Sequence, residues 1–197
     1  MTCTTVYHCR HARFILFITP MKKIFFILLF SSQAVLAQFV DANLKASGLT
    51  CSMCNLATQR QLQQLTFIDS IVPDLDLNLF HIYFNQQQEV DIDLIKKSVE
   101  DAGFSVAELL VSFKKNETFI YNNPLLFIGK SVFVVKGFDP QKDKQVFKII
   151  DEGFVTAKEF KKGERYTAMS CYKTGLAGTC CSTFGLKPGT RIYHVSI

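Results

Sequence analysis

The stretch Gly48-Leu49-Thr50-Cys51-Ser52-Met53-Cys54 places two cysteines two residues apart in the sequence. Residues 43–47 before it alternate apolar and polar side chains, which is typical of a half-buried strand. Apolar residues after it recur at near-helical spacing, at Ala57, Leu62 and Leu65. The cysteines therefore lie at a predicted strand-to-helix junction, where the helix N-terminus stabilises negative sulfur and lowers the pKa of a thiol. Two exposed thiolates of this kind suit a soft metal ion, Cu(I) above all, with Zn(II) as an alternative.

The elements that follow complete an order typical of one fold class. In chain order, the residue pattern predicts a strand at 67–72, a turn at 73–76, a strand at 79–84 and a strand at 104–111. A helix is predicted to start at Asp91, a good N-cap residue, and to stop at Gly103. The resulting order is β-α-β-β-α-β, which predicts an α+β, ferredoxin-like domain.

Two short motifs carry a resemblance to a known family. Residues 48–54 match the pattern G-M-T-C-x-x-C, and residues 100–104 read Glu-Asp-Ala-Gly-Phe, which matches E-D-A-G-[YF]. Three apolar positions of the family also match, at Leu62, Leu65 and Ile68. On these residues, the segment of about 41–112 resembles a heavy-metal-associated domain, the module of copper chaperones, copper-ATPase amino termini and periplasmic mercury-binding proteins. One residue departs from the pattern, because the loop methionine is Leu49 here, a swap that conserves volume.

The resemblance assigns roles to individual side chains. It implies that Cys51 and Cys54 are the metal ligands. It also implies that Phe104 lies beside the metal loop and excludes solvent from it, with Thr50 and Met53 as further neighbours of the ion. Met53 is either a soft third ligand or a side chain that faces solvent.

The implied function is that of a metal-binding protein rather than an enzyme. One soft ion would be held by the thiolate pair and passed to a partner protein with exposed cysteines, through an intermediate that shares three sulfurs. No combination of general acid, base and nucleophile is evident in the sequence, so we expect no enzymatic activity. The alternatives are an Hg(II) or Zn(II) binder on the same fold, a thiol–disulfide oxidoreductase that uses Cys51 and Cys54, and an inert disulfide.

The first 37 residues read as a bacterial secretory signal. A basic start at Met21-Lys22-Lys23 precedes the apolar run 24–30, and the small-residue end at 35–37 predicts cleavage after Ala37. Residues 1–20 fit poorly before such a signal, so we expect the true start to be Met21. The alternative is an unusually long amino-terminal region of the signal. The mature protein would then be periplasmic or secreted. It would lack a stable membrane anchor, because the apolar run is too short to span a bilayer.

The positive charge of the chain is concentrated in the predicted signal. Four basic residues precede position 38 (Arg10, Arg13, Lys22 and Lys23), and their removal lowers the formal net charge from +5 to +1. No basic surface for nucleic acid is therefore predicted for the mature protein.

A second domain is predicted after a polar break. The domain boundaries are 38–113 for the heavy-metal-associated domain, 114–117 for the linker and 118–197 for a mostly-β domain. Strands are expected in the second domain at 125–128, 131–135, 145–150, 165–170 and 190–197, and Thr156 with Glu159 forms a capping box that opens a short helix. An OB-like barrel is one order compatible with these elements.

The remaining cysteines of the predicted mature protein lie in this second domain. Its soft groups are Cys171, Cys180, Cys181 and His194. One interpretation is a disulfide from Cys171 to Cys180 or Cys181 that pins the glycine-rich loop between Lys173 and Gly189. The other interpretation is a second metal site. The odd total of five cysteines in the mature chain leaves at least one thiol outside any disulfide.

Overall fold

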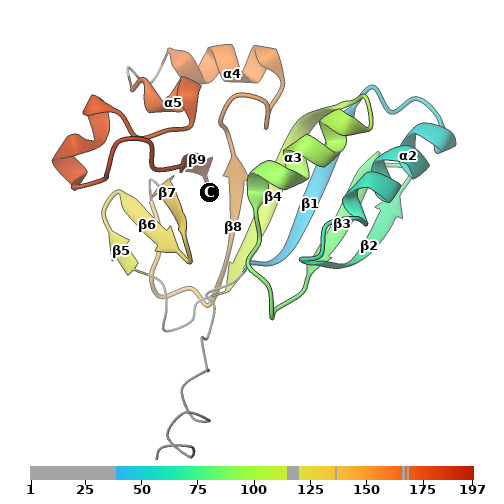
Figure 1. The fold of residues 1–197 in the computed structure, drawn as a ribbon, viewed down its shortest axis with the longest axis horizontal. Coiled ribbons are helices and arrows are strands. Elements are labelled where there is room, and N and C mark those ends of the chain that lie inside the picture. The colour runs from blue at the N-terminus through green and yellow to red at the C-terminus, as the bar shows by residue number, and fades with distance from the viewer. Residues whose placement is uncertain (1–38, 115–119, 136, 166, 168) are drawn as a thin grey trace, which may run out of the picture. The chain divides into compact units, whose positions relative to one another are not determined.

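The first half of the chain has the predicted β-α-β-β-α-β order, so this part of the fold prediction is confirmed (Figure 1). The computed structural model describes residues 39–114, 120–135, 137–165, 167 and 169–197. The predicted signal, its cleavage site and the start at Met21 lie outside these residues. The elements are β1 (Phe39–Ser47), α2 (Ser52–Leu62), β2 (Ile68–Asp74), β3 (Leu79–Phe84), α3 (Ile92–Asp101) and β4 (Ser105–Lys114).

Local chemistry explains the limits of these elements. Asp91 caps α3 as predicted, because its carboxylate accepts hydrogen bonds from the backbone N–H groups of Asp93 and Leu94. Gly103 follows the helix with a φ of +88°, a conformation that favours glycine. The predicted turn at 73–76 begins two residues later, because Pro73 and Asp74 still pair with β3. Proline is tolerated there since β2 is the edge strand of the sheet.

The second half contributes five strands and three short helical segments. They are β5 (Ile120–Asn122), β6 (Leu125–Ile128), β7 (Ser131–Val135), β8 (Lys144–Ile149), α4 (Ala157–Glu164), α5 (Cys171–Thr174), a 3-10 helix η1 (Thr179–Phe184) and β9 (Ile192–Ser196). Thr156 caps α4, and its hydroxyl accepts from the backbone N–H of Glu159 as the capping box predicted. The helices of the described chain are all too short or too polar to cross a membrane.

The strand predicted at 165–170 is wrong where the structure describes it. Arg165 is the C-cap of α4 and Ser170 is the N-cap of α5. The backbone N–H of Tyr172 bonds to the carbonyl of Met169, which turns the chain locally instead of extending it. This turn buries the side chains of Cys171 and Tyr172 together, which a strand with alternating faces would not do.

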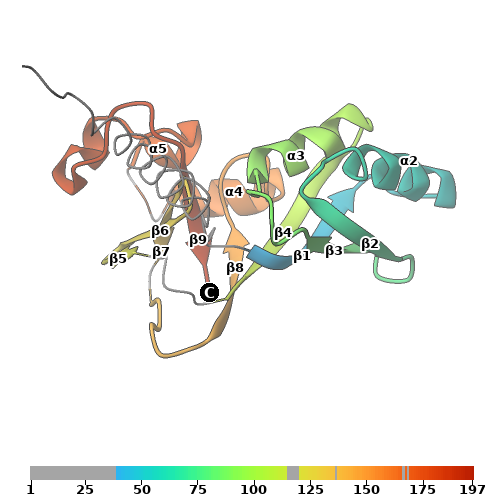
Figure 2. The ribbon, with the colours of Figure 1, turned by 60° about the horizontal axis from the view of Figure 1, so that its bottom comes forward.

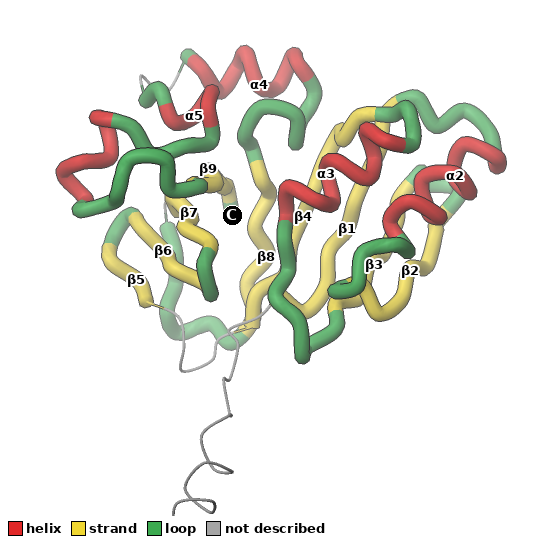
Figure 3. The backbone as a smooth tube through the Cα atoms, in the orientation of Figure 1, coloured by secondary structure: helices red, strands yellow, loops and turns green. Residues whose placement is uncertain are grey.

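One sheet joins the two halves. Its order is β2-β3-β1-β4-β8-β9-β7-β6-β5, and β4 pairs antiparallel with β8 from Leu110 opposite Lys148 to Lys114 opposite Lys144. Only β7 and β9 are parallel neighbours among the described pairs. The OB-like barrel is not confirmed, since the described pairings of the second half form an open continuation of the first sheet. Figure 3 shows α4 and α5 following β8 at one end of the sheet.

The main hydrophobic core contains residues from both sides of the predicted linker. Helices α2 and α3 lie side by side on one face of the sheet (Figures 1 and 2). In the core, the rings of Phe113 and Phe147 stack with their centroids 6.3 Å apart. The ring of Phe133 stacks on Phe147 at the same centroid distance. All three phenylalanines are buried. Burial of this aromatic surface stabilises the packing of β4 and β8 in addition to their backbone pairing.

Candidate metal centre

The predicted metal loop lies between β1 and α2, and Cys51 is the N-cap of the helix. Its backbone is extended, with φ −148° and ψ 161°, and its sulfur accepts a hydrogen bond from the backbone N–H of Cys54 at 3.3 Å. Its carbonyl accepts from the N–H groups of Cys54 and Asn55 at 3.1 and 3.2 Å. A sulfur therefore occupies the place that serine or aspartate oxygens take at most helix starts. Negative charge on this sulfur is stabilised by the helix N-terminus.

The two predicted ligands lie next to each other. Cys51 Sγ and Cys54 Sγ are 2.7 Å apart, Cys51 is exposed and Cys54 is half-buried. The hydrogen bond from the Cys54 side chain, followed by the bond from its backbone N–H, lowers the pKa of Cys51 below the ordinary thiol value. Cys51 consequently carries more thiolate at neutral pH than an isolated cysteine does.

The underside of the loop is anchored in the core. Leu49 is buried in the main core, and Cys54 and Phe104 pack against the same cluster. The ring of Phe104 lies under the loop, because a Cβ at Gly48 would come within 3.4 Å of its Cδ1 atom. The hydroxyl of the buried Thr58 donates to the carbonyl of Cys54 at 3.1 Å. These contacts hold Cys54 in place and leave Cys51 accessible to solvent.

Of the three residues predicted to lie near the metal ion, one packs beside the loop and two face solvent. Phe104 lies beside the loop as the resemblance implied. Met53 is 67% exposed, so its thioether is solvent-facing in this structure. Thr50 is also exposed. Within residues 39–114, 120–135, 137–165, 167 and 169–197, no three His, Cys, Asp or Glu side chains form a group that could hold one metal ion.

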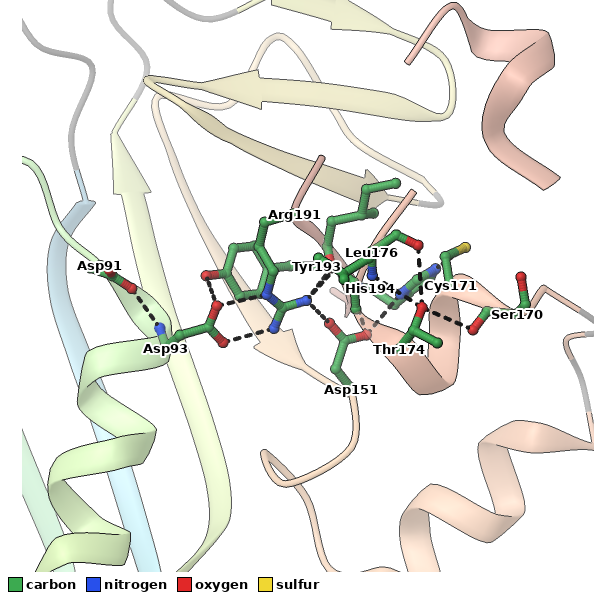
Figure 4. Close-up of polar contacts among 12 residues, drawn as sticks. Asp91, Asp93, Asp151, Ser170, Cys171, Thr174, Leu176, Arg191, Tyr193 and His194 are labelled. Atoms are coloured by element: carbon green, nitrogen blue, oxygen red, sulfur yellow. Dashed lines mark hydrogen bonds and ion pairs between the residues drawn. The ribbon is translucent and has the colours of Figure 1, made fainter. Parts of the chain in front are cut away.

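A second cluster of soft groups forms in the other half of the sheet. Cys171 Sγ lies 3.5 Å from Cys181 Sγ. It also lies 3.5 Å from His194 Nε2 (Figure 4). Cys171, Cys181 and His194 are all buried. The side chain of Cys180 lies outside the described residues. The 3.5 Å between Cys171 Sγ and Cys181 Sγ is a contact distance and not the length of a disulfide bond, so the structure does not contain the Cys171–Cys181 disulfide that was one of the two expected pairings.

Sequence reasoning missed the charged residues that surround this cluster. Asp151 Oδ1 is 2.7 Å from His194 Nδ1, and Arg191 Nη1 is 3.3 Å from Asp151 Oδ2. The guanidinium also binds Asp93 of α3 through two bonds of 2.7 and 2.8 Å. Burial alone would raise the pKa of Asp93, but the hydrogen bond and charge of Arg191 lower it below its ordinary value. No local pattern could have indicated these contacts, because they join residues 40 to 98 positions apart.

No family model matches the chain, and no curated protein sequence matches it. Among solved structures, the chain is similar to the yeast copper transporter domain Ccc2a, with 31% identity over 33% of this chain and 88% of that one, at a TM-score of 0.30. It is similar to the CopZ metallochaperone at 21% identity, over 34% of this chain and 98% of that one, with a TM-score of 0.32. A potential copper-translocating P-type ATPase from Bacillus subtilis gives 16% identity over 43% of this chain and 99% of its N-terminal domain, at a TM-score of 0.31.

Proposed function

We propose that the chain binds one soft metal ion, Cu(I) in preference, between Cys51 and Cys54 and passes it to a partner protein with exposed cysteines. The observation that carries this proposal is the pair of adjacent sulfurs at the N-terminus of α2, one exposed and one anchored. The lowered pKa of Cys51 supports it, since the thiolate is the form that binds metal.

Charge and coordination number favour Cu(I) over Zn(II). Two thiolates around Cu(I) leave one net negative charge, which the backbone N–H groups and the dipole of the helix N-terminus stabilise. Zn(II) usually takes four ligands at about 2.0 to 2.3 Å, and the loop supplies two sulfurs. Hg(II) on the same pair remains the alternative, because it is also soft. To hold either ion, the sulfurs must separate beyond their 2.7 Å contact, and the exposed Cys51 side chain is the one able to move.

Transfer would proceed by exchange of thiolates. A cysteine of the partner approaches the ion from the side of the exposed Cys51, while Cys54 stays held by the core contacts of the loop. The ion is then shared by three sulfurs, and the bond to Cys51 breaks before the bond to Cys54. The exposed apolar side chains of Met53 and Leu56 flank this approach and would contact the partner. With the predicted signal removed, this exchange would take place in the periplasm or outside the cell.

The test is an anaerobic titration of the reduced chain with Cu(I), Hg(II) and Zn(II), with a chromophoric chelator competing for Cu(I). We expect close to one equivalent of tightly bound Cu(I), and loss of this binding in Cys51→Ser/Cys54→Ser. The matched control is Cys171→Ser/Cys181→Ser, which should keep the full equivalent. Unchanged binding in the Cys51/Cys54 variant would reject the proposed site, and stronger binding of another ion would reassign the metal.

A further inference from the structure

Four buried side chains around Cys171 form a continuous row of contacts. Cys181 S–H donates to Cys171 Sγ at 3.5 Å. Cys171 Sγ lies 3.5 Å from His194 Nε2, and His194 Nδ1 lies 2.7 Å from Asp151 Oδ1 (Figure 4). Cys181, Cys171 and His194 come from η1, α5 and β9, and Asp151 lies in the segment after β8. The row is a chain of neighbours rather than a cage, consistent with the absence of any three-ligand metal group among the described residues.

The two ring nitrogens of His194 face different partners, with Nδ1 against Asp151 and Nε2 against Cys171. Asp151 Oδ1 accepts a hydrogen bond from the backbone N–H of His194 at 3.1 Å and another from its Nδ1 at 2.7 Å. These two bonds fix the orientation of the imidazole ring. With the Nδ1 proton donated to Asp151, Nε2 is left to take the proton of the Cys171 thiol. The ring of Tyr172 packs edge-on against the imidazole at 5.4 Å and keeps it in place.

Charges of alternating sign continue the row beyond Asp151. Asp93, Arg191 and Asp151 carry negative, positive and negative charge in order, and a Cys171 thiolate with a His194 imidazolium would extend the alternation by two. Arg191 also donates to the carbonyl of Gly175, which ties the segment after α5 to the row. A buried charge is tolerated when it is paired in this way. Such pairing would stabilise a Cys171 thiolate beside a His194 imidazolium.

We propose that Cys171 and Cys181 form a dithiol that reduces disulfides, with Cys171 as the attacking sulfur and Cys181 as the resolving one. The Cys171 thiolate attacks one sulfur of the target disulfide, forms a mixed disulfide and releases the first target thiolate. Cys181 then attacks Cys171 Sγ from its position 3.5 Å away, closes the Cys171–Cys181 disulfide and releases the second thiolate. The two protons of the dithiol, one of them held on His194, pass to the released thiolates. The target gains two electrons and the dithiol loses two.

The target reaches the dithiol by way of the turn that carries Cys171. A pocket of about 300 Å³ lies at this turn, and its lining includes Met169, Ser170 and Tyr172 on either side of Cys171 along the chain. Both sulfurs are covered, at 0% and 1% exposure, so an outward movement of this turn is part of the reaction.

The test uses the full chain with Cys3, Cys9, Cys51, Cys54 and Cys180 replaced by serine, so that Cys171 and Cys181 are its only cysteines. The probe is 4,4′-dithiodipyridine, which releases one thione at each step. We expect two equivalents of thione, the second released at a rate independent of probe concentration. The further change Cys181→Ser should stop the reaction at one equivalent. A chain that keeps Cys180 in place of Cys181 is the matched control and should close at least tenfold more slowly. Equal closure in both chains, or no Cys171–Cys181 disulfide, overturns the proposal.

The role of His194 has its own readout. With a thiolate already formed, the attack rate should change less than threefold between pH 6 and pH 8. His194→Gln should slow attack at least tenfold at pH 6 and less than twofold at pH 9, because an ordinary thiol with a pKa near 8.5 is almost fully protonated at pH 6. If the variant does not fold, the profile of the parent chain decides: a rate that rises about tenfold per pH unit would reject the role of His194.

Two disulfide sources can be compared directly. Glutathione disulfide represents small targets, and a second copy of the chain with Cys51 and Cys54 oxidised represents a protein target. Reduction of either disulfide supports the proposed dithiol activity. The disulfide that reacts faster indicates whether the preferred target is a small molecule or a protein. Inertness toward both overturns it. Metal binding by Cys51 and Cys54 is measured separately, so failure of one proposal leaves the other standing.

Discussion

The ion pair between Asp93 and Arg191 should contribute measurably to stability, and Asp93→Asn tests this. Two charge-assisted hydrogen bonds of 2.7 and 2.8 Å connect the carboxylate on α3 to the guanidinium at the start of β9. The hydroxyl of Tyr193 adds a third contact to the same carboxylate at 3.1 Å. Asparagine keeps the size of the side chain and removes its charge. The substitution therefore reports on electrostatics rather than on packing.

The magnitude follows from the exposure of the two groups. Breaking a fully buried pair costs about 3–5 kcal/mol, whereas a fully exposed pair contributes about 0–1 kcal/mol. The side chains of Arg191 and Asp93 are 26% and 39% exposed, and Arg191 keeps Asp151 as a partner after the change. Loss of a first-turn acid also weakens the helix by about 0.3–1 kcal/mol. We expect a loss of about 2 kcal/mol in the free energy of unfolding, or about 4–8 °C in Tm.

The pH dependence gives the decisive check. The folded-state pKa of Asp93 is lowered from an ordinary value of 3.8, so its contribution is present above that pH and is lost as the pH falls through the folded value. In urea unfolding, the difference between the two proteins should be full at pH 7 and should shrink as the pH falls below 3.8. Asp101→Asn on the same helix is the matched control, because its pair with Lys97 is 49–62% exposed, and it should change stability by less than about 0.5 kcal/mol. Equal stability of parent and Asp93→Asn at pH 7, or a difference that grows as the pH falls below 3.8, would refute the reasoning.

Three further predictions concern single side chains. Alkylation of Cys51 by iodoacetamide should reach half its maximal rate at a lower pH than for an ordinary thiol, and Cys54→Ala should move this midpoint upward, since the largest cause of the lowered pKa is the Cys54 side chain; a midpoint that does not move would contradict this cause. Leu49→Met should change the free energy of unfolding by less than about 1 kcal/mol, whereas Leu49→Ala should cost about 2–4 kcal/mol because the side chain is buried in the main core; similar urea midpoints for both variants would count against its packing role. Thr156→Ala should cost about 1 kcal/mol through loss of the α4 cap, and Thr156→Ser should restore most of it; thermal unfolding that shows no loss in the alanine variant would argue against the cap.

The elements of the first half were predictable because their signals are local. Asp91 was identified as an N-cap and Gly103 as a helix stop from residue type and position, and both act over one helical turn. The C-x-x-C spacing likewise brings Cys51 and Cys54 together through a single turn of helix. The strand expected at 165–170 failed because residue types alone did not reveal that Cys171 and Tyr172 are buried together on a helical turn.

The sequence by itself determined the β-α-β-β-α-β order, the strand-to-helix junction and the pair of candidate ligands, because each depends on interactions within a few residues. Only the tertiary structure decided that β8 extends the sheet from β4, and that Asp151 and His194, 43 positions apart, meet beside Cys171. The same holds for Asp93 and Arg191, which are 98 positions apart. Contacts at such separations are selected by the packing of the shared aromatic core and by pairing of buried charges, and neither leaves a periodic trace in the chain.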